Sequence, residues 1–237
     1  MTLACPALIS SFDLALCRPV DIYCERTSTA LDAELVNAFT NAAFLVAAWA
    51  AWHMHRQAPP RAIRAIRVLI FLMALTGLGS FLFHTVATRW AEWGDVIPIV
   101  AFMLAYMWFA MTWLFGLAIV TKLLVIVGFS IVTLWLEAQV PSTVLWGGAF
   151  YLPTVLVAVT VAAALQRMGH PAARAMAVAV STFFLAFAMR SLDSPLCATV
   201  PTGTHFLWHL LNALFVYLLV RLAILHGSDP AGQPARG

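Results

Sequence analysis

Five polar residues that could bind a metal ion and transfer protons stand in otherwise apolar stretches of the sequence. Ser80 and His84 are four residues apart, as are His205 and His209, and Asp95 follows eleven residues after His84. Four residues of an α-helix rise about 6 Å and turn about 40° past a full circle, so each pair projects from one helix face. Three histidines with a fourth position left open are typical of catalytic zinc. The lack of Met or Cys among them argues against a copper electron-transfer site.

Long apolar segments must position these residues. The chain has 237 residues, of which 63% are hydrophobic and only 10% charged, far from the roughly half-apolar and quarter-charged balance of a soluble domain. Seven segments approach the ~20 residues that a membrane span needs, and they are 34–52, 66–86, 95–115, 117–135, 145–165, 173–189 and 203–225. We predict an all-α, polytopic membrane protein with a seven-transmembrane-helix bundle.

This interpretation divides the chain into three parts. Residues 1–33 form an extramembrane N-terminal loop, residues 34–226 the transmembrane domain, and residues 227–237 a disordered C-terminal tail. The bilayer is then the main environment of the chain, and no length is left for a soluble domain. No run of like charges indicates a nucleic-acid surface, and nothing in the sequence indicates an oligomeric state.

The positive charges orient the bundle. With the N-terminus outside, nine of the 13 lysines and arginines face the cytoplasm and four lie outside, as the positive-inside rule requires. We therefore predict a periplasmic, extracellular or lumenal N-terminus and a cytoplasmic C-terminus. All four cysteines then fall in outside segments, where disulfides persist; they are Cys5, Cys17, Cys24 and Cys197. Four cysteines allow three pairings, and spacing alone does not choose among them.

The predicted orientation brings the five polar residues to one membrane depth. Ser80 and His84 lie in the outer half of the second span, Asp95 begins the third, and His205 and His209 lie in the first turns of the seventh. Taken singly, each histidine could be a packing residue, Asp95 a helix cap, and Ser80 a donor to its own helix. Ionisable groups inside spans are costly and usually functional, so their coincidence favours an outer-leaflet site that hydrolyses a lipid amide or ester.

The motifs resemble those of a known family. Ser80-Phe-Leu-Phe-His84, Asp95 and His205-Phe-Leu-Trp-His209 are similar to the signature of the CREST superfamily, which joins the alkaline ceramidases with adiponectin-receptor-like proteins. The N-terminal segments around Asp21-Ile-Tyr-Cys24-Glu25, Glu34-Leu-Val-Asn37 and Thr40-Asn41 are similar to the alkaline ceramidase branch. The resemblance implies a zinc-dependent enzyme that cleaves a ceramide-like lipid substrate to a sphingoid base and a fatty acid.

The same resemblance assigns roles to individual residues. It places zinc on His84, His205 and His209, and catalysis on Ser80 and Asp95. It further implies a calcium ion held by Asp21, Glu25 and Glu34, and a disulfide between Cys24 and Cys197. The chain departs from the family pattern in the calcium segment. One extra residue separates Asp21 from Cys24, Thr27 stands where an Asn ligand is usual, and the stretch from Cys24 to Glu34 is shorter.

Two other classes of protein stay open at this point. A receptor-like seven-helix protein of the same superfamily would have little or no hydrolase activity, and a haem protein could use His84 and His209 as its two axial ligands. A retinal protein is excluded in practice, because the only lysine is Lys122, outside the last span. The preference for arginine over lysine, with much alanine, is typical of a GC-rich bacterial source.

Overall fold

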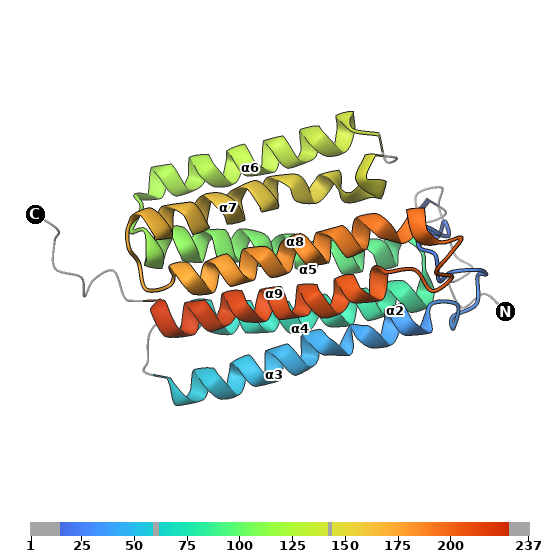
Figure 1. Cartoon of the computed structure of the whole chain (residues 1–237), viewed down its shortest axis with the longest axis horizontal. Coiled ribbons are helices and arrows are strands. Elements are labelled where there is room, and N and C mark those ends of the chain that lie inside the picture. Colours follow the sequence, from blue (N-terminus) through green and yellow to red (C-terminus); the bar gives the residue numbers. More distant parts are fainter. Residues whose placement is uncertain (1–14, 59–61, 142–143, 228–237) are drawn as a thin grey trace, which may run out of the picture.

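The computed structural model describes residues 15–58, 62–141 and 144–227. Within these ranges, seven helices are long and apolar enough to cross a membrane, which confirms the predicted all-α, seven-helix membrane fold (Figure 1). The chain is therefore a multi-pass integral membrane protein. The helical elements are α2 (Leu35–Thr40), α3 (Ala42–Gln57), α4 (Ile63–Val86), α5 (Arg89–Phe109), η1 (Ala110–Leu114), α6 (Ile119–Gln139), η2 (Val144–Tyr151), α7 (Leu152–Arg167), α8 (Ala173–Leu196) and α9 (His205–His226).

Apolar side chains cover both the inside and the outside of this bundle. Met73, Leu165 and Val220 are completely buried, whereas Leu124 and Leu134 expose 68% and 70% of their surface. In water, so much exposed apolar surface would drive association. Acyl chains solvate such a surface, so the outward faces fit a bilayer.

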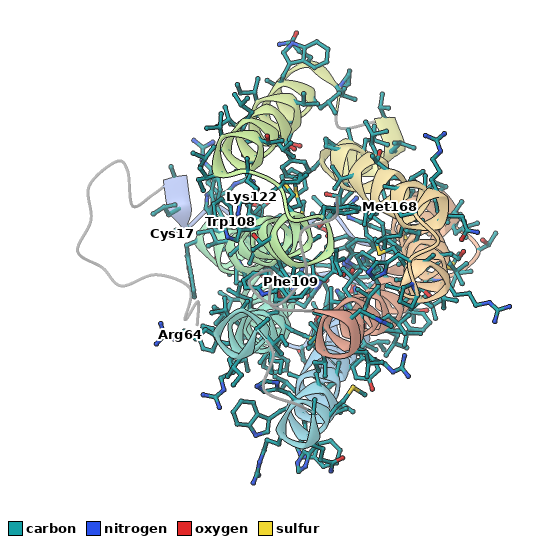
Figure 2. All side chains as sticks on the ribbon, turned by 90° about the vertical axis from the view of Figure 1, so that its left-hand side faces the viewer. Cys17, Arg64, Trp108, Phe109, Lys122 and Met168 are labelled. Atoms are coloured by element: carbon teal, nitrogen blue, oxygen red, sulfur yellow. A yellow bond between two sulfur atoms is a disulfide. The ribbon has the colours of Figure 1, made fainter. Side chains whose placement is uncertain are left out.

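The packing of the helices brings together the elements that carry the candidate site residues. α4 lies along α5, α8 lies along α9, and α3 packs against both α4 and α9, while α3 and α6 stand at opposite margins of the bundle (Figure 1). The single lysine of the chain lies where α6 approaches the end of α5. Lys122 Nζ donates to Thr112 Oγ1 at 3.2 Å and stands 4.7 Å from the centre of the Trp108 ring (Figure 2).

The boundaries of two spans differ most from those that their apolar segments predict. The third begins at Arg89, before the predicted start at residue 95, and the sixth continues to Leu196, beyond the predicted end at residue 189. Arg190 and Asp193 were expected outside the membrane helices and are instead part of α8. A helix can continue past its apolar stretch where the polar side chains find partners inside the protein, as Asp193 does.

The segment before α2 folds over the end of the bundle at which α9 begins (Figure 1). Pro19 and Thr88 form an antiparallel bridge, and the Val20 amide donates to the Ala87 carbonyl at 2.9 Å. The structure has the disulfide between Cys24 and Cys197 that the family resemblance implied. Cys17 is also disulfide-bonded. Two separate attachments thus hold the N-terminal segment to the turn after α4 and to the end of α8.

Candidate metal centre and active site

Three histidines converge beneath this segment. His84 of α4 and His205 and His209 of α9 offer ring nitrogens that all lie within 4.8 Å of one another, and all three side chains are buried. His84 Nε2 and His205 Nδ1 have no hydrogen-bond partner in the part of the chain that the structure describes. Because buried polar atoms normally have a partner, these nitrogens and their spacing fit a bound metal ion with three imidazole ligands.

A carboxylate orients the first of the three histidines. His84 Nδ1 lies 2.6 Å from Glu34 Oε2, so this nitrogen donates and Nε2 is left to bind a metal. Burial alone would raise the pKa of Glu34, but its hydrogen bonds with His84 and Arg26 and the charge of Arg26 lower this pKa below the ordinary value. An ionised carboxylate that accepts from a ligating histidine is a common second partner in metal sites, and it raises the basicity of the ligand.

A hydroxyl group orients His209, the second of the three histidines. His209 Nδ1 lies 3.0 Å from Thr40 Oγ1. The single hydroxyl proton of Thr40 is directed to the carbonyl oxygens of Val36 and Asn37, at 2.8 and 3.0 Å. The hydroxyl oxygen can then only accept from His209, so Nδ1 carries the proton of this ring and Nε2 is free to bind a metal.

An aromatic ring covers His205, the third of the three histidines. The Tyr23 ring stacks on His205 with centroids 3.6 Å apart and planes inclined by 18°. Burial raises the pKa of Tyr23 well above its ordinary value, so its phenol stays protonated. Its hydroxyl hydrogen-bonds with Arg190, whose guanidinium also lies 5.3 Å from the centre of the Tyr151 ring. The N-terminal segment and α2 therefore together supply a neighbour to each of the three histidines.

Asp193 fixes the start of α9. Its Oδ1 accepts from the amides of Thr204 and His205 at 2.7 and 2.9 Å, and its Oδ2 accepts from the amide of Cys24 at 3.0 Å. The first amides of a helix have no partner within the helix, and here a buried carboxylate satisfies two of them. Gly203 has a φ of +65°, and a Cβ there would lie 1.9 Å from Asp193 Oδ1, so only glycine fits this turn.

Ser80 and Asp95 meet beside a close approach of the α4 and α5 backbones. Pro98 has no amide proton, so the Gly94 carbonyl has no donor four residues on. This carbonyl faces Gly79 of α4, where a Cβ would come within 2.2 Å of it. The next residue along each helix is Ser80 or Asp95, and the Ser80 hydroxyl hydrogen-bonds to the Asp95 carboxylate. Asp95 Oδ1 is buried and has no hydrogen-bond partner within the described ranges.

An apolar cavity of about 470 Å³ lies deeper in the bundle. The end of the cavity nearest the site is lined by Thr76, Ile99 and Asn212. Each of these lies about one helical turn from a site residue of the same helix, which is Ser80, Asp95 or His209, respectively. Met107 and Leu219 line it further from the site. The volume falls within the range of small-molecule sites, and its walls suit a hydrocarbon chain.

The proposed calcium ligands do not form a comparable cluster. Glu25 Oε1 and Oε2 accept from the amides of Val36 and Asn37, at 2.6 and 2.8 Å, so this carboxylate caps α2. Glu34 is paired with Arg26 and His84, and Asp21 is exposed. Among the described residues, the only group of three acidic, histidine or cysteine side chains close enough to share an ion is the histidine cluster. Asp21, Glu25 and Glu34 therefore do not converge on a shared ion in this structure.

The fold and the site define a multi-pass membrane protein with a buried three-histidine cluster, able to hold a metal ion, at one end of its bundle. The sequence model of the ceramidase family matches residues 21–234, so the chain belongs to the ceramidase family. This confirms the resemblance identified from the motifs. No curated protein sequence matches the chain.

Several residues around the histidines have roles that spacing did not reveal. Thr40, Tyr23 and Glu34 belong to the ceramidase-like segments, but their pairing with particular histidines depends on how the N-terminal segment folds. Asp193 could have been noticed, because an acidic residue beside an apolar span must find partners. Gly79 carries a weaker signal, as one of several small residues in α4.

Proposed function

We propose that the chain is a zinc-dependent hydrolase that cleaves the amide bond of a ceramide-like sphingolipid, releasing a sphingoid base and a fatty acid. The observation that carries this proposal is the buried cluster of His84, His205 and His209, beside the hydrogen-bonded Ser80 and Asp95. An all-imidazole set with an open position is the donor set of catalytic zinc. Membership of the ceramidase family supports the choice of an amide.

Zinc in such a site lowers the pKa of water toward 7 and polarises a carbonyl. Asp95 has a buried oxygen without a partner, so it can accept the proton of the attacking water and return it to the leaving amine. The Ser80 hydroxyl has only one proton, which it donates to Asp95 at rest. Once Asp95 is protonated, the hydrogen bond can reverse, and the Ser80 proton can turn to the oxyanion that forms on the substrate. One proton transfer would thus prepare the oxyanion donor.

The cavity supports a lipid substrate. The end of the cavity nearest the site is one helical turn from the polar residues, so an acyl chain could occupy the bundle while the amide lies at the histidines.

The haem alternative fits poorly. The rings of His84 and His209 have centroids 4.7 Å apart, which leaves no room for a macrocycle between two axial ligands.

The test is metal analysis of the purified protein together with hydrolysis of a fluorescent ceramide. We expect about one zinc per chain. Asp95→Asn should retain zinc and lose about 100-fold to 10,000-fold in turnover per zinc-loaded molecule, as for a lost general base. Ser80→Ala should retain zinc and lose about 100-fold to 1,000-fold, as for a lost oxyanion donor. Glu137→Gln, which removes an exposed acid of α6, is the control and should turn over normally.

Two outcomes would contradict the proposal. Normal turnover by Asp95→Asn with a lowered melting temperature would reduce Asp95 to a helix cap. Zinc-loaded wild-type protein that binds ceramide without cleaving it would identify a receptor-like member of the superfamily.

A further inference from the structure

Arg26 occupies an unusual place for a guanidinium. Its side chain is 4% exposed, and every nitrogen of the guanidinium has an oxygen partner. Nε donates to Glu34 Oε1, Nη1 to the carbonyls of Ser28 and Ala30 at 3.1 and 3.4 Å, and Nη2 to the carbonyl of His84 at 3.0 Å. One carboxylate and three carbonyl oxygens thus surround a positive charge.

These oxygens are of the kind that a calcium ion takes in proteins, which are carboxylates and backbone carbonyls. Calcium is also the cation that the family resemblance implied for this segment. Here the acceptors point at an arginine. Of the two other acids expected as ligands, Glu25 accepts from two backbone amides and Asp21 is exposed.

The balance of buried charges also indicates that Arg26 takes the place of a metal cation here. A buried carboxylate is costly unless a countercharge accompanies it, and a metal-ligating imidazole is neutral. Arg26 is therefore the countercharge of Glu34 at this site. A divalent ion bound to the same oxygens would lie against a buried guanidinium and be repelled by it.

We infer that Arg26 replaces the calcium ion of this segment. The guanidinium is a covalently attached cation that joins the loop carbonyls to Glu34 and to the backbone of a metal ligand. It holds Glu34 in place to accept from His84, so Arg26 is a positioning residue for the metal centre. Because the cation is part of the chain, the stability and activity of the protein become independent of calcium.

The first test uses the wild-type protein and needs no activity. We expect no bound calcium in elemental analysis of zinc-loaded protein, and the same melting temperature with millimolar calcium as in calcium-depleted buffer. About one calcium per chain, with a melting temperature that rises on its addition, would overturn the inference. This result is independent of the proposed function, on which the inference depends only in taking His84 as a metal ligand.

The second test removes the cation. Arg26→Ala should weaken zinc affinity by about 10-fold to 100-fold, as expected for a lost partner of a metal ligand, and millimolar guanidinium should recover part of this loss. Arg26→Lys keeps the positive charge and loses the planar set of guanidinium donors, so its zinc affinity should lie between those of the wild type and Arg26→Ala. The visible spectrum of cobalt-substituted protein would report a changed ligand geometry. Arg89→Ala removes an exposed arginine that is paired with Glu92, and it is the matched control.

Zinc affinity and cobalt spectrum in Arg26→Ala that equal those of Arg89→Ala would refute the positioning role. If Arg26→Ala does not fold, Arg26→Lys decides the same question.

Discussion

Gly79→Ala tests whether the contact between α4 and α5 positions the catalytic pair. The added Cβ would lie 2.2 Å from the Gly94 carbonyl oxygen, and an ordinary contact needs at least 3.4 Å. The nearest neighbour is backbone, which cannot rotate away like a side chain, so the two helices must separate by about 1.2 Å at this point. A misplacement of about 1 Å can reduce a catalysed rate by about 100-fold. We expect a loss of that size in kcat, with a destabilisation of about 1–3 kcal/mol from overpacking.

The assay is ceramide turnover per zinc-loaded molecule, with zinc occupancy measured on the same preparation. None of the three histidines lies on α5, so displacement of α5 leaves the metal centre intact and moves Asp95 away from Ser80. Gly94→Ala is the matched control, because a Cβ at that position meets no atom within 4 Å, and it should have normal kcat. A wild-type kcat in Gly79→Ala would refute the argument that this close approach sets the distance between Ser80 and Asp95.

Three further predictions follow from the contacts around the metal centre. Glu34→Gln should weaken zinc affinity by about 10-fold to 100-fold in a chelator competition, and an unchanged affinity would mean that its bond to His84 is incidental. Asp193→Asn should lower the free energy of unfolding by about 1.5–3 kcal/mol, because bonds to a charged acceptor are lost; a melting temperature equal to that of the wild type would argue against this anchor. Replacing Cys24 and Cys197 together by serine opens a loop of 173 residues and should cost about 5 kcal/mol in the chain-entropy model. A melting temperature that is insensitive to reduction would contradict this last expectation.

The fold could be predicted because lipid imposes simple rules on a sequence. Each span must be long and apolar, so composition and segment length were enough to identify seven helices. The largest errors lie at the start of the third span and at the end of the sixth, where α8 continues through Arg190 and Asp193. A hydropathy criterion ends a span at such residues, whereas the folded protein satisfies Asp193 with backbone amides and Arg190 with the hydroxyl of Tyr23.

The proposed site residues could be selected because helical periodicity and membrane depth restrict where side chains can meet. Spacing placed His205 beside His209, and depth placed His84 near them. Their partners could not be predicted in this way, because Glu34 and Thr40 reach the histidines through a segment with no strong periodic pattern. The role of Arg26 could not be predicted for the same reason. In the sequence it is an ordinary loop cation, and only the structure shows the oxygens around it.

The position of the N-terminal segment follows from the chemistry of the ligands. An imidazole that binds a metal through one nitrogen has a second nitrogen that needs an acceptor, and a bilayer provides none. For His84 and His209 these acceptors are Glu34 and Thr40, just before the first span and in its opening turns. The segment that leads into them must therefore lie across the mouth of the bundle, and the bonds of Asp193 to Cys24 and to the start of α9 keep it there. In this protein the loop is as much a part of the metal centre as the two helices that carry its ligands.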